Sequence, residues 1–161
     1  MGKILYFECN KHKEHNHEFF IGIGMLFPEQ YDKIIKQIKK GKYGKEIKKF
    51  LEENPDGAIN CNTEIAQCPK CGKLKEVPNL SMYVPKDNNE KADKSYVMSW
   101  ELKEKYKKVK EYKHVCPKCS SEMKIIKIEY DEYGDIVKIG KIKCPECDGS
   151  VEWNGDCGCW D

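Results

Sequence analysis

Residues 116–147, CPKCSSEMKIIKIEYDEYGDIVKIGKIKCPEC, decide the fold, because two Cys-x-x-Cys pairs enclose a stretch of 24 residues there. Each pair places two thiolates on one tight turn, which supplies half of a tetrahedral metal site. Between the pairs, residues 123–130 and 136–143 favour strands, and residues 131–134 favour a turn. The stretch therefore predicts a β-hairpin with a metal-binding turn at each end.

This arrangement resembles a zinc ribbon, and the motifs that carry the resemblance are Cys116-Pro117-Lys118-Cys119 and Cys144-Pro145-Glu146-Cys147. In zinc ribbons two such turns, called knuckles, face each other across one metal ion, and a three-stranded sheet extends away from it. Residues 149–153 favour the third strand. The resemblance implies one site whose four ligands are Cys116, Cys119, Cys144 and Cys147. Independently of it, four sulfur ligands suit zinc or iron. We expect zinc, because nothing in the sequence indicates a redox partner.

A third pair, Cys68-Pro69-Lys70-Cys71, needs partners elsewhere in the chain. Gly72 follows it, as in rubredoxin knuckles, which this turn resembles, and glycine lets backbone amides turn toward sulfur. Cys9 and His12 have the same spacing, with an imidazole in place of one thiolate, and they follow an expected strand over residues 3–9. We therefore expect two structural zinc ions, the second one bound by Cys9, His12, Cys68 and Cys71.

Two alternatives to this pairing stay open. His15 and His17 lie close to His12 in sequence, and either can replace it. A rival pairing joins the Cys68 and Cys116 turns in one site, so that the remaining turn binds with two cysteines near the C-terminus; that second set is Cys144, Cys147, Cys157 and Cys159. We prefer the first pairing, because it uses every Cys-x-x-Cys at ordinary spacing.

The other cysteines have simpler interpretations. We expect Cys61 to be a small buried side chain. Cys157 and Cys159 form a tail beside the second ribbon, or else a third metal site or a redox-active thiol pair. Exposure and pKa decide among these roles, and a sequence shows neither.

The expected fold class is α+β, with two consecutive zinc-ribbon-like antiparallel β modules. The first covers residues 1–85 and carries an inserted helical hairpin at about residues 29–53, where Tyr31, Ile34 and Ile38 recur at helical spacing. The charged, asparagine-rich segment 86–94 is the expected boundary loop, and residues 95–161 form the second module. A further helix is expected within residues 96–112.

Composition supports metal over disulfides. The 161-residue chain has 39% hydrophobic and 35% charged residues, a low apolar content for a self-sufficient core, and it has ten cysteines. The N-terminal apolar run is broken by charge too early for a secretory signal, and the longest apolar stretch, residues 19–27, is too short to span a membrane. We therefore expect a cytoplasmic protein, in which close cysteine pairs bind metal.

The charge distribution suggests where a partner binds. The net charge of +2 gives no strong overall attraction to nucleic acid, but residues 33–49 contain eight lysines and one acid, Glu46. The absence of arginine removes the side chain that most often reads guanine edges. The expected contact face for a nucleic acid or protein partner consists of Lys33, Lys36, Lys40, Lys45, Lys48 and Lys49.

The sequence is compatible with two functions. The first is a non-enzymatic interaction module that uses zinc only for its structure, because closed four-ligand sites leave no position for a substrate. The alternative is a thiol-redox or metal-dependent enzyme. It would use the Cys157 and Cys159 pair, or the histidine-rich loop 12–17 with Glu14 or Glu18 as a base.

Overall fold

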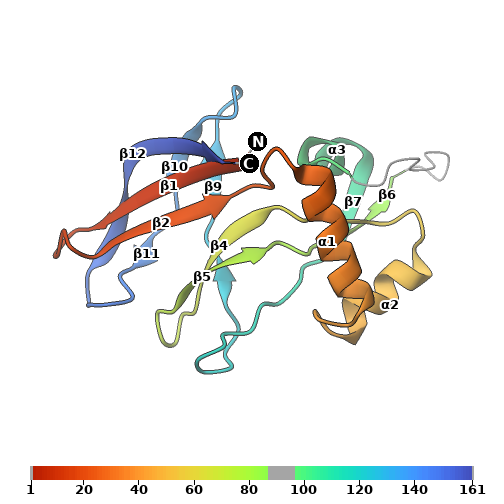
Figure 1. Cartoon of the computed structure of the whole chain (residues 1–161), viewed down its shortest axis with the longest axis horizontal. Helices are drawn as coiled ribbons and strands as arrows, with labels where there is room; N and C mark the ends of the chain where they lie inside the picture. The colour runs from red at the N-terminus through yellow and green to blue at the C-terminus, as the bar shows by residue number, and fades with distance from the viewer. Residues whose placement is uncertain (1, 87–96, 161) are drawn as a thin grey trace. The chain divides into compact units, whose positions relative to one another are not determined.

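The computed structural model describes residues 2–86 and 97–160, except for the side chains at positions 156 and 157. All but the first residue of the expected boundary loop, 86–94, lies outside these ranges. The chain forms two compact units, and neither is continuous in sequence (Figure 1). The first unit contains Met1–Gly22, Thr63–Val77 and Lys113–Trp160, and the second contains Ile23–Asn62 and Pro78–Tyr112. The expected consecutive modules therefore differ from the observed division, because all three Cys-x-x-Cys turns belong to one unit.

The α+β class is confirmed. The described residues form three helices and twelve strands, and the strands pair antiparallel in small sheets. No helix among these residues has both the length and the apolar character that a membrane crossing requires.

The largest sheet of the first unit joins the two ends of the chain. Its strand order is β11-β12-β1-β2, and the strands are β1 (Gly2–Cys9), β2 (Asn16–Ile21), β11 (Ile142–Lys143) and β12 (Ser150–Trp160). The expected strand over residues 3–9 is present, and it pairs antiparallel with β12 from Gly2↔Trp160 to Cys9↔Val151 (Figure 1). The third strand expected over residues 149–153 thus continues much further and pairs with the N-terminal strand.

Alternation along β1 separates its core face from its solvent face. Leu5, Phe7 and Cys9 are buried, whereas Tyr6 and Glu8 between them are exposed. The Phe7 ring meets the Phe19 ring edge to face, with ring centroids 5.5 Å apart. This period-two pattern fixes the register, because a slip of one residue would turn the apolar set to water.

The remaining strands of the first unit form two smaller sheets. A three-stranded sheet has the order β5-β4-β8, and its strands are β4 (Thr63–Gln67), β5 (Leu74–Pro78) and β8 (Lys124–Ile125). β9 (Ile128–Tyr130) and β10 (Ile136–Ile139) form the hairpin expected between the second and third turns, in shortened form. Residues 124 and 125, which were expected in the first strand of that hairpin, form β8 and pair with β4 instead. The paired residues are Ala66↔Ile125 and Gln67↔Lys124.

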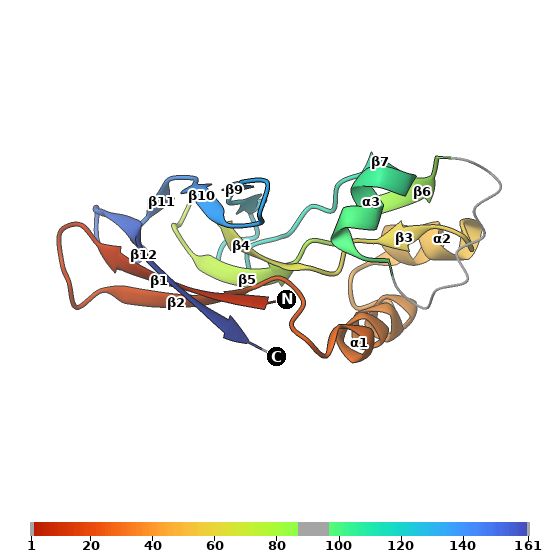
Figure 2. The same cartoon turned by 90° about the horizontal axis from the view of Figure 1, so that it is seen from above.

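The second unit contains the helices. α1 (Phe27–Lys39) and α2 (Lys45–Glu53) confirm the expected helical hairpin (Figure 2). Both helices contribute to a core that includes the fully buried Ile38, Ile47 and Ile59. The three-stranded sheet β3-β6-β7 consists of β3 (Ala58–Ile59), β6 (Met82–Pro85) and β7 (Tyr106–Lys110).

The helix expected within residues 96–112 is only partly present. α3 spans Ser99–Lys105, and the chain then becomes β7. β7 pairs with β6 through Tyr83↔Lys108 and Val84↔Lys107, so strand pairing overrides the helical spacing of Trp100, Tyr106 and Val109.

The two faces of β1 give a direct test of this register. Phe7→Ala should lower the free energy of unfolding by about 3–5 kcal/mol, because a buried ring leaves a cavity. The neighbouring Tyr6→Ala should cost about 1 kcal/mol or less, because this side chain is already partly in water. Urea denaturation of the reduced protein measures both, and equal losses would contradict the assigned faces.

Candidate metal centres

Two clusters of metal-binding side chains form in the first unit. The four-cysteine cluster consists of Cys68, Cys71, Cys116 and Cys119, and the cysteine–histidine cluster consists of Cys9, His15, Cys144 and Cys147. Within each cluster the candidate ligand atoms all lie within 4.8 Å of one another. Each cluster therefore has the donor number and spacing to bind one metal ion.

Two turns of the same shape build the four-cysteine cluster. In each, the residue after the second cysteine donates its N–H to the carbonyl of the first: Gly72 to Cys68 and Ser120 to Cys116, both at 2.9 Å. These two residues have φ values of +72° and +57°, the left-handed region that glycine favours. The repeated Cys-Pro-Lys-Cys sequence thus forms a repeated structure, and the cluster joins two similar halves.

The sulfur distances fit a shared metal ion. Cys68 Sγ lies 3.4 Å from Cys119 Sγ, and Cys71 Sγ lies 3.6 Å from Cys116 Sγ. A disulfide bond needs about 2.05 Å, and these cysteines are free. A tetrahedron with metal–sulfur bonds of about 2.3 Å has edges of about 3.8 Å. The four sulfurs are therefore spaced almost as tetrahedral ligands.

Hydrogen bonds to sulfur favour the thiolate form of some cysteines in each cluster. The backbone N–H and the side chain of Ser121 lower the pKa of Cys119 to about 6. At Cys9 burial acts to raise the pKa, but hydrogen bonds from the backbone of Lys11 and His12 outweigh it and lower the pKa to about 7. The thiolate is the form that binds metal. At Cys71 and Cys147 a backbone hydrogen bond lowers the pKa, but burial and the neighbouring thiols outweigh it and raise the pKa of each to about 11. Each cluster therefore contains thiols with lowered and with raised pKa values.

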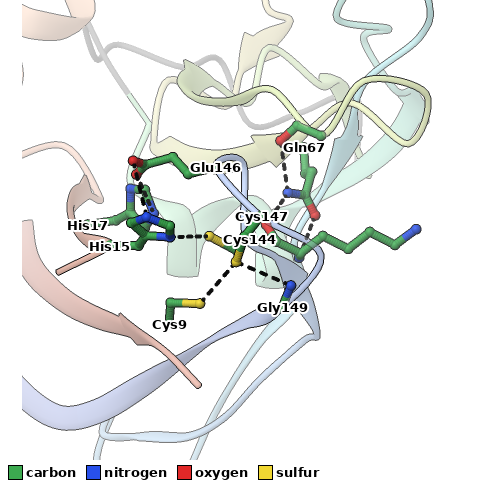
Figure 3. Close-up of polar contacts among 10 residues, drawn as sticks. Cys9, His15, His17, Gln67, Cys144, Glu146, Cys147 and Gly149 are labelled. Carbon is green, nitrogen blue, oxygen red and sulfur yellow. Dashed lines mark hydrogen bonds and ion pairs between the residues drawn. The ribbon is translucent and has the colours of Figure 1, made fainter. Parts of the chain in front are cut away.

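The cysteine–histidine cluster brings together both ends of the chain (Figure 3). Cys9 Sγ lies 3.5 Å from Cys147 Sγ, and His15 Nδ1 lies 3.6 Å from Cys144 Sγ. The hairpin turn between β1 and β2 places the histidine, because the Cys9 N–H donates to the carbonyl of His15 at 3.1 Å. The imidazole therefore lies beside the thiols.

Glu146 lies near the second ring nitrogen of His15, Nε2. One carboxylate oxygen lies 3.9 Å from His15 Nε2, and the other lies 3.7 Å from Nε2 of the neighbouring His17 (Figure 3). A carboxylate on the second ring nitrogen is the usual way to orient a metal-binding histidine. Glu146 lies inside the Cys144–Cys147 turn, so one tetrapeptide supplies two thiols and a carboxylate close to the imidazole, although beyond hydrogen-bond distance.

Gly149 closes the other side of this cluster. Its N–H donates to Cys147 Sγ at 3.3 Å (Figure 3). A Cβ atom at this position would lie 2.8 Å from Asn10 Oδ1 and 3.0 Å from Cys9 Sγ. The close approach of backbone to sulfur therefore requires glycine here.

The structure brings together seven of the eight expected ligands, namely Cys9, Cys68, Cys71, Cys116, Cys119, Cys144 and Cys147. His12 lies outside both clusters, with its Nδ1 3.4 Å from Glu14 Oε1 and its side chain 48% exposed. His15, the alternative that was left open, lies in the cluster instead. Sequence spacing favoured His12, but the hairpin turn selects His15.

The grouping of the pairs is also corrected. The Cys68 turn faces the Cys116 turn, as in the rival pairing, because β4 pairs with β8. The Cys144 turn faces Cys9 and His15, because β12 pairs with β1. Neither of the two pairings that the sequence suggested contains both observed clusters. The identical Cys-Pro-Lys-Cys tetrapeptides were the available signal, since two like halves build one symmetric site.

The remaining cysteines lie apart from both clusters where the structure describes them. Cys61 is buried in the second unit, as expected, and burial raises the pKa of its thiol to about 12. Cys159 is exposed. The side chain of Cys157 lies outside the described part, and so does any site that would include it.

Replacing each of the two histidines, His12 and His15, by alanine in separate variants tests the ligand assignment. His15→Ala should reduce tightly bound metal from two ions per chain toward one, because the cysteine–histidine cluster loses a donor. His12→Ala should retain both ions, because the His12 side chain touches the cluster only through the His15 ring, at a centroid distance of 4.9 Å, and is half exposed. Native mass spectrometry counts the ions, and loss of metal in the His12 variant alone would reverse the assignment.

Comparison of the chain with models of protein families, with curated proteins and with solved structures finds no match among them. The resemblance to zinc ribbons therefore rests on the knuckle motifs. What the structure itself shows is two clusters of four donors that could each bind a metal ion.

Proposed function

We propose that the protein is a non-enzymatic interaction module whose first unit is stabilised by two structural zinc ions, one in each cluster. The observation that carries this proposal is the closed donor set. Each cluster has four protein donors at mutual contact distance. Four protein ligands complete a tetrahedral zinc site, whereas catalytic sites keep one position for water or substrate.

The weak local core supports a structural role for the metal. Around the four-cysteine cluster the buried residues are Ala66, Cys68, Val77, Cys116 and Met123, so the ligands form much of this core themselves. β8 and β11, the strands next to the turns, have only two residues each. A structural zinc ion supplies on the order of 10 kcal/mol or more, which can offset such sparse packing.

The donor sets support zinc over iron. Zinc binds both four-cysteine and three-cysteine–one-histidine sites with tetrahedral geometry. Iron–sulfur chemistry favours thiolates throughout, which suits only one of the two clusters. A single metal therefore accounts for both.

Metal removal tests this proposal. The reduced protein should contain two zinc ions per chain, and chelation should unfold the first unit. The near-ultraviolet circular dichroism should then lose the contribution of the aromatic side chains of the first unit, among them Trp153 and Trp160. The helical far-ultraviolet signal of α1 and α2 should persist, because these helices have their own core. Metal-free protein with unchanged spectra and an unchanged denaturation midpoint would contradict the structural role, and iron in place of zinc would contradict the choice of metal.

The proposed contact surface lies on α1 and the start of α2. Residues 33–45 contain six lysines and no acid, and all six are exposed. Among the described residues no carboxylate forms an ion pair with Lys33 or Lys36 of α1, or with Lys40, which directly follows it. The three lysines recur at helical spacing. Lys48 and Lys49 pair instead with Glu52 and Glu53, at 3.9 and 3.5 Å. The unpaired positive charge of the expected face thus lies mainly on α1.

A phosphate backbone suits this surface best. Lysine ammonium groups act as point charges on phosphates, and without arginine the bidentate reading of guanine is absent. We therefore infer binding to the backbone of a nucleic acid, with little sequence preference.

Replacement of Lys33, Lys36 and Lys40 by Gln should weaken the binding of a single-stranded oligonucleotide. The slope of log affinity against log salt is negative, and it should become less steep by about 2. Each of the three lost phosphate contacts removes about 0.7 from its magnitude. The control changes the same net charge in the first unit, through Lys124, Lys138 and Lys141 to Gln, and should have a much smaller effect. Fluorescence anisotropy at several salt concentrations measures both. Equal losses in the two variants, or no binding by the unmodified protein, would contradict the assigned surface.

A further inference from the structure

Gln67 lies between the two clusters. It is the last residue of β4, it directly precedes Cys68, and it is buried with 8% of its surface exposed. Its amide reaches Lys143, the last residue of β11, which directly precedes Cys144 (Figure 3). One side chain thus connects the residue before the first ligand of one cluster to a ligand-bearing turn of the other.

Three hydrogen bonds fix this amide. Its Oε1 accepts from the Lys143 N–H at 3.0 Å, and its Nε2 donates to the Lys143 carbonyl at 2.8 Å. The Nε2 also donates to the carbonyl of Gly72 at 3.0 Å, directly after Cys71. The first two bonds occupy both backbone groups of Lys143, as a neighbouring strand would. β11 is an edge strand of its sheet, and Gln67 covers that edge.

The backbones of the two turns also approach each other at this point. A Cβ atom on Gly72 would lie 4.0 Å from the Cα atom of Pro145, which is ordinary van der Waals contact. Gly72 follows the Cys68 turn, and Pro145 lies inside the Cys144 turn. The two knuckles therefore lie close together, although they belong to different clusters.

We propose that Gln67 couples the two metal sites, so that filling either one raises the metal affinity of the other. Metal at the four-cysteine cluster fixes Cys68 and Cys71, and with them the Gln67 amide and the Gly72 carbonyl. The amide then holds Lys143 and hence the start of the Cys144 turn. A second ion meets ligands that are already ordered, so its binding costs less conformational entropy. Such coupling is reciprocal. The inference rests on the proposed function, since both clusters must bind metal.

A double-mutant cycle tests the coupling, with cobalt(II) as the probe. Four-thiolate and three-thiolate–imidazole sites give different cobalt absorption spectra, so competition with a chelator yields the affinity of each site separately. With Gln67 present, Cys116→Ser should weaken cobalt binding at the cysteine–histidine cluster about tenfold. In the Gln67→Ala background the same change should alter that affinity by less than about twofold.

Asn54→Ala provides the matched control background. This residue also donates its side-chain amide to a backbone carbonyl, that of Phe50 at 2.9 Å, but in the second unit. The tenfold effect of Cys116→Ser should remain in this background. An effect that disappears with either amide would indicate general destabilisation and would overturn the specific role of Gln67.

A second measurement needs no ligand substitution and covers the case in which Cys116→Ser does not fold. Native mass spectrometry with one equivalent of cobalt counts the metal-free, one-metal and two-metal chains of the unmodified protein and of Gln67→Ala. The quotient of the squared one-metal population over the product of the other two should be about tenfold lower in the unmodified protein, because coupling favours the filling of both sites. Equal quotients for the two proteins would overturn the coupling and leave the two metal sites standing. Failure of both clusters to bind metal would overturn the proposed function together with this inference.

Discussion

Two clusters of four candidate donor atoms form in the first unit. The close approach of these atoms within each cluster is the constraint around which the rest of this unit is arranged. In the four-cysteine cluster, sulfurs from residues 68–71 and 116–119 lie 3.4 to 3.6 Å apart. Thiolates at such distances repel one another unless a cation lies between them. β8 and β11, the strands beside the Cys116 and Cys144 turns, have only two residues each, so strand pairing gives these turns little support. A cation at the centre of the cluster would offset the repulsion between the thiolates.

The second unit has a different physical basis. Its helices bury Ile38 and Ile47 against β3 and β6, so an ordinary apolar core accounts for it. Its surface carries the lysines of α1, which no described carboxylate neutralises. The first unit adds two clusters of candidate metal donors to an apolar core that includes Leu5, Phe7 and Ile65. The second unit has no such cluster among its described residues, and the proposed interaction role depends on its exposed lysines.

Local patterns predicted much of this structure. Apolar residues at helical spacing predicted the helical hairpin that α1 and α2 form, and the expected strand over residues 3–9 corresponds to β1. The expectation within residues 96–112 was wrong beyond Lys105, because pairing of β7 with β6 depends on residues more than twenty positions away. The division into consecutive modules differed for the same reason. Sequence proximity says little about which strands become neighbours.

The metal ligands show most clearly what each level of structure decides. The sequence alone determined that Cys68 with Cys71, Cys116 with Cys119, and Cys144 with Cys147 are half-sites, because a spacing of three residues places two thiols on one turn. The tertiary structure alone decided which halves meet. Pairing of β4 with β8 joins the first two turns, and pairing of β1 with β12 brings the third to Cys9. The choice of His15 over His12 was likewise decided by the fold, because the hydrogen bond that closes the hairpin turn at Cys9 is made by the carbonyl of His15.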